Sequence, residues 1–519
     1  MGFWKKITPF PLPDWEDKVN CMIWGNDKGK NKKMWNDKSR SRYRALIFLC
    51  VLLSIAILML HYTATEVQAK TVIKEITIGK GKSYAVGQDI DISGKAVYKT
   101  SNRKVTWKSS NKKVATVKNG KITAKKKGKA HMIHVSASAD SDNANGTKEH
   151  PFGSIQEAVN HASGGSEIII EEGTYEPFAV SEDISGTEKD ITIIKAADGA
   201  HPVIQVPKKK RLGNSIGIYM ENVSYLCLDG LEISGGTHGI YYESNGDVRS
   251  TMLSGITIRN CLICDIDGVH GIAVYATNDK IPVTGLVLKE CEVYNCKCGD
   301  SESVVVNGNI DGFTICKNII HDNNNIGIDM IGFEGTALHG ASYDGNRYDV
   351  DFVRNGKCYG NKVYNISAEG NAAYLENGEY SLCAAGIYVD GGQNIQIYEN
   401  EILNCDIGIE VATEHNPKEN PLFQVAGIEV YDNEITRCSG FAGLSFGGYD
   451  SKRGFTVDCH FYRNTLTDNP VQIVVQRSRD NEIDHNTIIG GKVFVEYNEE
   501  LPKEEMKNNF HDNVRKKVK

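Results

Sequence analysis

Amphipathic helical spacing is nearly absent from this chain of 519 residues, and long apolar runs are scarce. Between 255 and 489 apolar and polar residues alternate as they do in strands, which excludes a helical bundle. A single long apolar run, at 45–60, lies close to the N-terminus. These absences leave an all-β protein with one N-terminal segment for export or anchoring.

A short motif recurs from 255 to 489: a β-branched strand, an Asn or Cys, a second strand, then Gly-Ile-x-hydrophobic. It occurs as GITIRNCLI with HGIAVYA (255–276) and again as GIEVYDNEI with AGLSFGG (427–448). Self-similarity of this length with β spacing is typical of a β-solenoid, in which each coil stacks on its neighbours. We therefore predict stacked coils of about 22 residues with inserted loops.

Alignment of the repeats places one Cys or Asn of each coil in a single column. The column contains Cys261, Cys291, Asn318, Asn361, Asn400, Asn433, Asn464 and Asn486. A stacked Asn side chain suits an inward turn, because its amide can hydrogen-bond the next coil and the buried backbone. We interpret this column as structural.

Twelve of the fourteen cysteines lie in the repeats, several of them at equivalent positions such as Cys261 and Cys291. Adjacent coils are roughly 4.8 Å apart, which a disulfide tolerates. Stacked buried thiols are the simpler interpretation. The CxxC at Cys261 and Cys264 and the CxC at Cys296 and Cys298 lack a zinc-ribbon turn, so we do not predict a metal there.

Residues 45–69 are predicted to be a signal peptide or a signal-anchor. The apolar run follows three arginines and precedes a Val-Gln-Ala site that resembles a cleavage signal. If 45–60 stays in the membrane, residues 1–44 are cytoplasmic. Alternatively, 1–44 is an extension ahead of a start at Met22 or Met34. Both versions export the body of the protein.

Residues 70–136 resemble bacterial Ig-like domains of the intimin/invasin group. The features that match the pattern of this group are Trp107, an SSN turn, a VATV strand and the Asn119-Gly120 hairpin. The resemblance implies a small β-sandwich that serves as a spacer or adhesive module. Residues 70–129 carry 17 Lys and Arg against 3 Asp and Glu. This basic surface either binds an anionic cell-wall polymer or is simply solvated. We expect no nucleic-acid partner.

Residues 137–500 resemble right-handed parallel β-helix proteins of the pectate-lyase-like superfamily. The likeness begins with a short helix at 154–162 that covers the first coil, continues through EIIIEEGTY, and then runs along the repeats. Residues 501–519 are predicted to be a frayed, charged tail. The fold class is therefore an all-β solenoid that follows an Ig-like sandwich and an N-terminal signal or membrane segment.

The residue x of Gly-Ile-x-hydrophobic points out of the coil. Successive coils place Ala273, Val305, Asp329, Tyr388, Glu410 and Ser445 in this outward column. Asp390 lies two residues beyond Tyr388, and Asp329 and Glu410 are about 9.6 Å apart at two coil spacings. We predict that Asp329, Tyr388, Asp390 and Glu410 form a solvent-facing active centre.

Insertions at 333–352, 414–424 and 449–455 follow the same strands, and such insertions build the walls of a binding face. We predict His415 and Arg453 as catalytic side chains from these walls. The predicted substrate-binding residues are Glu334, Glu414, Tyr449 and Asp450.

Segment 310–332 resembles the calcium-binding region of family 9 pectate lyases, whose pattern is Asp-Asp-Gly-aromatic-Asp. The matching positions 325–329 read Asn-Ile-Gly-Ile-Asp, so only the carboxylate of Asp329 is kept and no Lys base carries over. The paired-Asp and RIK signatures of polygalacturonases and the DPHD motif of mannuronan epimerases are absent. An acidic groove repels a polyuronate unless a cation bridges them.

Two chemistries follow for the same carboxylates. In the first, calcium binds to Asp329, Asp390 and Glu410, and His415, Arg453 or Tyr388 is the base of a lyase. In the second, the carboxylates are the acid and base that hydrolyse a neutral glycan.

We predict a secreted or membrane-tethered bacterial enzyme that cleaves a polysaccharide, as a lyase or a glycoside hydrolase. The alternative is a surface protein without catalysis, whose β-helix binds glycan while the basic module adheres to the wall.

We predict one of two forms of the exported protein. In the first, the mature protein begins near Lys70. In the second, the protein stays anchored in the membrane with residues 1–44 inside the cell. N-terminal sequencing of protein from culture medium and from membranes distinguishes the two versions. Protein confined to the cytosol would contradict both.

Overall fold

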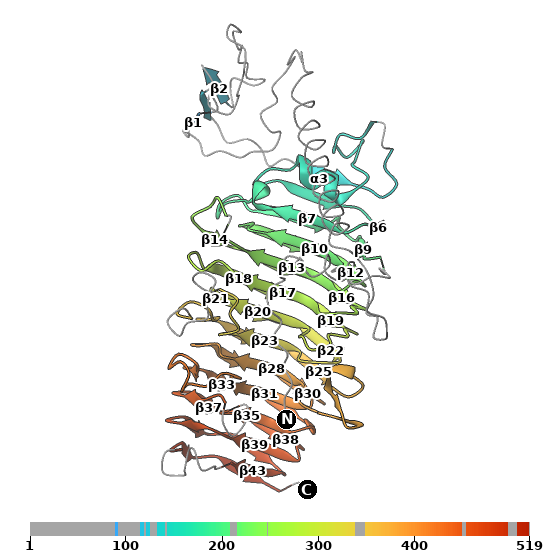
Figure 1. Ribbon diagram of the computed structural model, residues 1–519. Coiled ribbons are helices and arrows are strands. Elements are labelled where there is room, and N and C mark those ends of the chain that lie inside the picture. Colours follow the sequence, from blue (N-terminus) through green and yellow to red (C-terminus); the bar gives the residue numbers. More distant parts are fainter. Residues whose placement is uncertain are drawn as a thin grey trace, which may run out of the picture. The chain divides into compact units, whose positions relative to one another are not determined.

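The computed structural model describes residues 89–91, 115–118, 121–124, 132–140, 143–207, 215–246, 248–337, 348–448, 453–496 and 506–517. The predicted signal or anchor segment at 45–60 lies outside these ranges. None of the helices in the described part of the chain has the length and apolar character needed to cross a bilayer. From 132 onwards the described chain is a parallel β-helix built from three long sheets (Figure 1). The predicted solenoid is thereby confirmed.

Two of the long sheets have outward residues that are mostly half-exposed. The 14-stranded sheet contains β4 (Met132–Val135), β5 (Glu167–Ile170), β8 (Thr192–Ala196), β11 (Leu226–Asp229), β14 (Leu253–Ser254), β15 (Thr257–Arg259), β18 (Val283–Lys289), β21 (Ile310–Cys316), β24 (Lys357–Tyr359), β29 (Gln396–Tyr398), β33 (Glu429–Tyr431), β37 (His460–Tyr462), β41 (Glu482–Asp484) and β44 (Asn509–His511). The 12-stranded sheet contains β6 (Thr174–Tyr175), β9 (Val203–Gln205), β12 (Glu232–Ser234), β16 (Leu262–Cys264), β19 (Glu292–Tyr294), β22 (Ile319–Asn323), β25 (Lys362–Ile366), β30 (Glu401–Leu403), β34 (Glu434–Thr436), β38 (Thr465–Thr467), β42 (Thr487–Ile489) and β45 (Val514–Lys516).

The third long sheet carries the Gly-Ile-x-hydrophobic strands. Its 11 strands are β7 (Phe178–Ser181), β10 (Ile216–Glu221), β13 (His238–Ser244), β17 (His270–Ala276), β20 (Val304–Gly308), β23 (Ile328–Ile331), β28 (Ala385–Asp390), β31 (Ile407–Ala412), β35 (Ala442–Phe446), β39 (Val471–Val475) and β43 (Lys492–Val495). A coil passes through the 14-, the 12- and then the 11-stranded sheet, as β29, β30 and β31 do. Neighbouring coils pair in parallel, for example β28 with β31.

Short elements complete the described chain. They are β1 (Asp89–Asp91), β2 (Ala115–Lys118) and β3 (Lys121–Ala124), the hairpin β26 (Leu375–Glu376) and β27 (Glu379–Tyr380), the parallel set β32 (Val425–Ala426), β36 (Thr456–Val457) and β40 (Ser478–Arg479), the helix α3 (Ile155–His161), and the 3-10 turns η2 (Glu182–Ile184) and η3 (Ala372–Tyr374). Strands β1, β3 and β2 form an antiparallel sheet within the predicted Ig-like module.

The first coil carries the predicted helix. The Ser154 hydroxyl caps α3 by accepting from the Glu157 backbone N–H (3.2 Å), and Ile155 and Val159 are buried against the coil. The β-helix begins earlier than the sequence predicts. Strand β4, which we assigned to the Ig-like module, pairs in parallel with β5, because Ile133 and Val135 are fully buried in the β-helix core.

The β-helix also ends later than predicted. Strands β44 and β45, placed in the charged tail by the sequence, pair with β41 and β42 and add one more coil. The reason is that the hydrogen-bonded Asn side chains of the turns continue into this segment. The side-chain oxygen of Asn508 accepts from the Asn481 N–H (3.3 Å), and that of Asn513 accepts from the Asn486 N–H (3.0 Å).

The Asn residues of the predicted column form a hydrogen-bonded ladder. From Asn361 to Asn486, each side-chain oxygen accepts from the backbone N–H and the side-chain amide of the Asn one coil before, as Asn433 does from Asn400 (3.0 and 2.9 Å). At the start of the ladder, the Asn318 oxygen accepts from the Cys291 backbone N–H (3.0 Å). The Asn433 amide donates in turn to the Ile397 carbonyl (2.9 Å) and to the Asn464 side chain (2.9 Å). The residue before each Asn, such as Glu399 (φ 52°), has positive φ and makes the bend. The ladder therefore fixes which residues of successive coils lie side by side.

The repeated glycine of the Gly-Ile-x-hydrophobic strands is explained by the close approach of neighbouring coils. A Cβ on Gly408 would lie 2.3 Å from the Gly443 carbonyl oxygen of the next coil, so the first position of Gly-Ile-x-hydrophobic has no room for a side chain.

The twelve cysteines of the described ranges are all free thiols, and eleven of them are buried. Stacked thiols, rather than disulfides, are therefore confirmed.

Replacing one rung of the ladder should destabilise the β-helix. Asn400→Ala and Asn433→Ala each leave buried polar groups without partners, which costs roughly 1–3 kcal/mol. Denaturant unfolding of the purified protein measures the change. Glu434→Ala, at an exposed position beside Asn433, is the matched control and should unfold like the wild type. Wild-type stability of both Asn variants would contradict the assignment of the ladder.

Candidate active site

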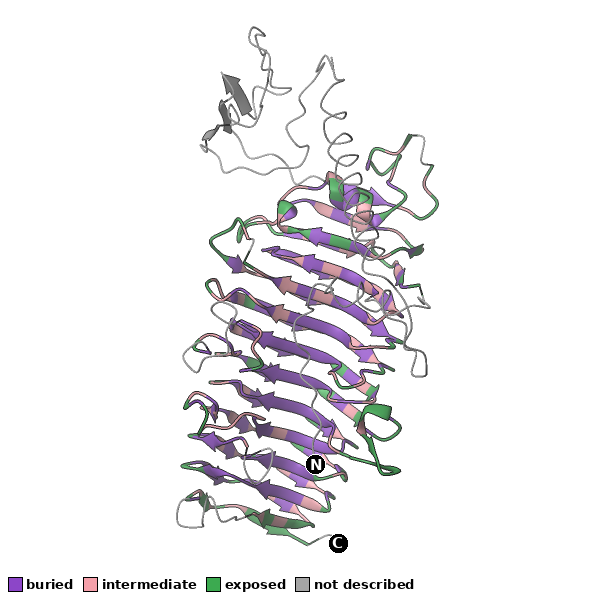
Figure 2. Cartoon of the chain, viewed as in Figure 1, coloured by how far each residue is buried: buried purple, intermediate pink, exposed green. Residues whose placement is uncertain are grey.

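The outer face of the 11-stranded sheet is buried in its central coils, unlike the outer faces of the other two sheets. Every residue of β20, β23, β28 and β35 is buried, whereas β29 and β33 alternate between half-exposed and buried residues. Figure 2 shows this sheet as a nearly continuous buried surface. Side chains that point out of the coil here therefore lose their contact with water.

The predicted outward column is confirmed by the strand register. Asp329 of β23 pairs with Tyr388 of β28, which pairs with Glu410 of β31, and Ser445 continues the column. The prediction that these side chains face solvent is wrong. Asp329 is 2%, Tyr388 5% and Asp390 6% exposed, and Glu410 is half-buried.

The chain that follows β31 turns back over the carboxylates and helps to bury them. The Glu414 N–H donates to Asp390 Oδ1 (3.2 Å), which places this turn against β28. His415 Nε2 lies 3.0 Å from Glu334 Oε1, so the insertions after β23 and β31 touch one another. The ring of His415 also packs against the ring of Phe423 in a tilted orientation, with ring centres 5.0 Å apart. The predicted wall of Glu334, Glu414 and His415 is therefore assembled.

Three other predicted wall residues are placed less completely. Arg453 is half-buried, and its neighbour Gly454 donates its N–H to the His415 carbonyl (2.7 Å). Tyr449 and Asp450 lie outside the described residues.

Burial and the repulsion of neighbouring carboxylates raise the pKa values of Asp329, Asp390 and Glu410. Burial raises the pKa of Glu410 to about 8, with a contribution from the negative charge of Glu414. Burial, then the charges of Glu302 and Asp390, hold the pKa of Asp329 well above its usual range. The pKa of Asp390 is raised by burial and by Glu414 and Glu334. At neutral pH the site therefore holds carboxyl groups that keep their protons.

The structure adds Glu302, His270 and Tyr275, which the sequence prediction missed. Burial, with the charges of Glu334 and Glu414, raises the pKa of Glu302 to about 8. His270 Nδ1 lies 3.0 Å from the Glu302 carbonyl, which can only accept, so Nδ1 carries the proton and Nε2 accepts from the Tyr275 hydroxyl (3.1 Å). Burial lowers the pKa of His270 to about 3, so this imidazole is neutral and serves to position its neighbours. His238 and His270 each lie immediately before the Gly of the repeated motif, and the structure pairs them on neighbouring strands. This repeated histidine is the feature of the sequence that could have pointed to the additional residues.

Within the described part of the chain, three buried polar atoms on this face have no hydrogen-bond partner: Asp329 Oδ1, the Tyr388 hydroxyl and Asn307 Oδ1. Asn307 pairs with Ile331 in the register, two residues beyond the Tyr388 column on the neighbouring strands, so it points to the same face. A buried polar atom without a partner is costly and points to a ligand that completes it. Ala273, Val305 and Ile331 form an apolar patch beside these atoms. The combination is suited to a ligand with hydroxyl groups and apolar faces.

The predicted calcium ligands do not form a ready cation cage. Among the described residues, Asp329, Asp390 and Glu410 do not bring three ligand atoms within 4.8 Å of one another. A hydroxyl group that donates a hydrogen bond would satisfy Asp329 Oδ1 as well as a calcium ion would. Calcium at these residues stays a prediction from the sequence.

Comparisons with known proteins agree with this architecture. Residues 133–327 match the family model described as Pel9A-like, right handed beta helix region, and residues 385–516 match the right handed beta helix region. Residues 66–146 match the bacterial Ig-like domain (group 2). The right-handed β-helix and the preceding Ig-like module are therefore confirmed.

One curated relative is an uncharacterized protein, YwoF, from Bacillus subtilis (strain 168). The two sequences are 34% identical over 397 residues, which is 72% of this chain and 77% of YwoF. This chain belongs to the YwoF family. The YwoF family thus includes chains in which a β-helix carries a buried cluster of carboxyl groups.

Solved structures share the fold of this member of the YwoF family. The lacto-N-biosidase of family GH136 from Eubacterium ramulus has a TM-score of 0.52 and 16% identity, over 75% of this chain and 68% of that one. Pectate lyase Pel9A has a TM-score of 0.45 and 13% identity, over 68% of this chain and 79% of that one. At such identities the likeness to the lacto-N-biosidase shows the fold alone.

The raised pKa values predict that stability falls as pH rises. The folded protein keeps the protons of Glu302 and Glu410 up to about pH 8, whereas the unfolded chain releases them near pH 4.5. Their stabilising effect is complete below the unfolded value and is lost as the pH passes the folded value. The double variant Glu302→Gln with Glu410→Gln should therefore lose less Tm than the wild type between these limits.

Differential scanning calorimetry across this pH range measures the slope of Tm. Glu434→Gln, an exposed carboxylate on the 12-stranded sheet, should keep the wild-type slope. A wild-type slope in the double variant would show that these two groups do not titrate as described.

Proposed function

We propose that this protein is an exported glycoside hydrolase that acts on a neutral glycan bound to the outer face of the 11-stranded sheet. The observation that carries the proposal is a half-buried Glu410 with a pKa of about 8, next to the buried carboxyl groups of Asp329 and Asp390. Hydrolysis of a glycosidic bond needs an acid that is still protonated at neutral pH and a second carboxylate.

The charges around the site favour a neutral substrate. In the described part of the chain, the leading electrostatic influences on Glu302, Asp329, Asp390 and Glu410 all come from other carboxylates. A polyuronate would add more negative charge to this buried cluster, and Coulomb repulsion opposes its binding. A neutral sugar instead offers hydroxyl groups to Asp329 Oδ1 and the Tyr388 hydroxyl, two of the three buried atoms on this face that lack a partner among the described residues.

The strand register suggests the roles of the carboxyl groups. Asp329 and Glu410 lie two rungs apart, about 9.6 Å for the backbone, which is near the upper end of the separation typical of inverting enzymes. Glu410 would protonate the leaving oxygen. Asp329 and Asp390 repel one another and therefore ionise in separate steps. The first of them to ionise would take a proton from the attacking water.

Loss of the acid should be most severe for poor leaving groups. Glu410→Gln should lower kcat roughly 100- to 10,000-fold on natural glycosides, but much less on aryl glycosides whose leaving group needs no proton. Asp329→Asn or Asp390→Asn, whichever is the base, should lower both rates. Steady-state kinetics on the substrate found in a screen of neutral glycans gives the comparison, and Glu434→Gln is the control.

The same screen separates this proposal from its competitors. Calcium-dependent release of unsaturated uronates, abolished by a chelator, would show a lyase instead. Saturable glycan binding without any turnover would show a surface adhesin. Full activity of Glu410→Gln on natural glycosides would remove Glu410 from the mechanism.

A further inference from the structure

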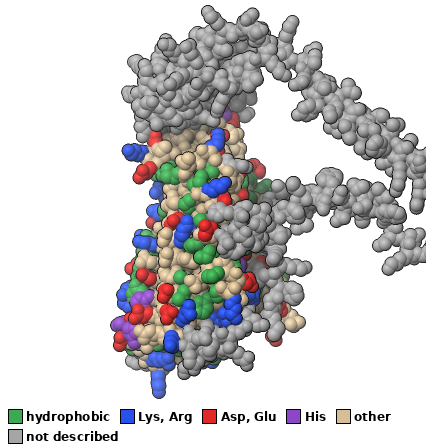
Figure 3. All heavy atoms as spheres, turned by 60° about the vertical axis from the view of Figure 1, so that its left-hand side comes forward, with side chains coloured by type: hydrophobic (Ala, Val, Ile, Leu, Met, Phe, Trp, Pro, Cys, Tyr) green, Lys and Arg blue, Asp and Glu red, His purple; other side chains and the backbone are tan. Residues whose placement is uncertain are grey.

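A second cluster of ionisable side chains lies on the 14-stranded sheet, near the C-terminal end of the β-helix and on a different sheet from the candidate active site. It contains His460 of β37, Glu482 and Asp484 of β41, and His511 of β44, the last strand of that sheet. Figure 3 shows histidine and carboxylate side chains gathered at the surface near the last coils. Nothing in the proposed hydrolysis uses these residues.

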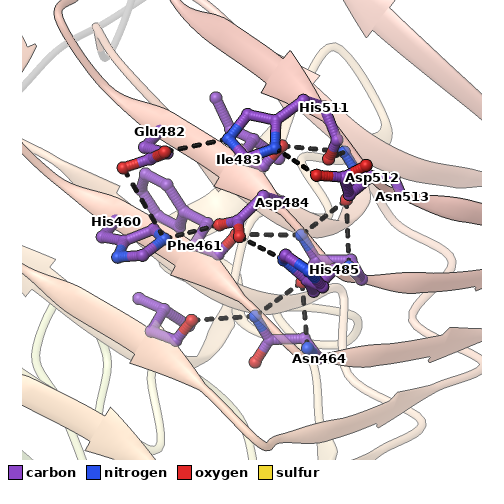
Figure 4. Close-up of polar contacts among 12 residues, drawn as sticks. His460, Phe461, Asn464, Glu482, Ile483, Asp484, His485, His511, Asp512 and Asn513 are labelled. Atoms are coloured by element: carbon purple, nitrogen blue, oxygen red, sulfur yellow. Dashed lines mark hydrogen bonds and ion pairs between the residues drawn. The ribbon is translucent and has the colours of Figure 1, made fainter.

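Three of these side chains converge on one point. His460 Nε2 lies 2.5 Å from Asp484 Oδ1 and 4.0 Å from Glu482 Oε2. One ligand atom from each of the three residues lies within 4.8 Å of the others. In Figure 4 the two carboxylates point toward the same edge of the His460 ring. The side chains are between 10% and 47% exposed, so an ion from solution can reach them.

The convergence differs from ordinary histidine–carboxylate pairing in this protein. His321 on the 12-stranded sheet also has two carboxylate neighbours, but it uses a different nitrogen for each: Nε2 for Glu292 (3.1 Å) and Nδ1 for Asp322 (2.6 Å). At His460 a single nitrogen faces both carboxylates. One N–H satisfies only one acceptor well, whereas a cation binds a nitrogen and two oxygens together.

Further side chains hold the two carboxylates in place. His511 Nε2 lies 2.9 Å from Glu482 Oε1, and its Nδ1 lies 2.9 Å from Asp512. His485 Nδ1 contacts Asp484 Oδ2, the oxygen that does not face His460. Each carboxylate therefore has one oxygen directed to the common point and the other fixed by an imidazole, which is the arrangement that supports metal ligands.

We propose that His460, Glu482 and Asp484 bind a divalent transition metal of the zinc class. One imidazole nitrogen and two carboxylate oxygens are a ligand set for such an ion, with a remaining position for water. The metal joins β37 to β41, and Glu482 extends the link to His511 on β44. It thereby stabilises the end of the β-helix, where Phe510 and Val514 of the last coil are 41% and 49% exposed.

The test is titration of the full chain with Zn²⁺ under reducing conditions, followed by calorimetry and by the shift in Tm. We expect one site that raises the Tm of the wild type. His460→Gln and Glu482→Gln should each weaken zinc binding at least tenfold and remove the Tm shift. His321→Gln is the matched control, because it removes a histidine that also has two carboxylate neighbours, and its zinc affinity should equal that of the wild type.

Co²⁺ in place of zinc separates this site from the cysteines. We expect the visible absorption of Co²⁺ bound to nitrogen and oxygen, without the charge-transfer band of a thiolate. Equal zinc affinity in the wild type and in both site variants, or a thiolate spectrum, would overturn the proposal. Because Glu482 is half-exposed, its Gln variant is expected to fold, which keeps the test valid if His460→Gln does not.

Discussion

The hydrogen bonds that lock each coil to the next are the constraint on which the rest of this structure depends. Backbone pairing alone sets the spacing of strands, but a strand can slip by one residue without losing many bonds. The side chains of Asn361, Asn400, Asn433 and Asn464 prevent this, since each one joins the backbone of its own turn to that of its neighbours. A fixed register then places chemically related residues of distant segments in columns.

Columns on the three sheets have different environments, and the environment decides the chemistry. On the 12- and 14-stranded sheets outward residues remain half-exposed, so a carboxylate there stays ionised and pairs with a histidine or an arginine. Asp229 of β11 illustrates this pairing, because its carboxylate lies 2.8 Å from the guanidinium of Arg259 on the neighbouring strand β15. In the central coils of the 11-stranded sheet the outward position is more deeply buried, and burial raises the pKa of Glu410 to about 8.

The two proposed sites follow from this contrast. Buried carboxyl groups repel one another and keep protons, which suits proton transfer to a leaving group. On the 14-stranded sheet, the half-exposed Glu482 and the buried Asp484 each have one oxygen held by an imidazole and the other directed to His460. One fold thus offers a proton donor on one sheet and a metal ligand set on another.

The sequence by itself determined the solenoid, the Asn column and the column of Asp329, Tyr388 and Glu410, because these depend on local spacing that repeats from coil to coil. Only the tertiary structure decided that this column is buried, since burial comes from loops whose path no repeat encodes. Glu302 and His270 lie in a second column that the repeat does encode, but only the structure shows that Glu302 is close enough to Asp329 to raise its pKa. Strand pairing between distant segments likewise decided that β4 and β44 belong to the β-helix. The local sequence pattern determines which residues share a face. Long-range packing determines how far that face is exposed to solvent, and therefore its chemistry.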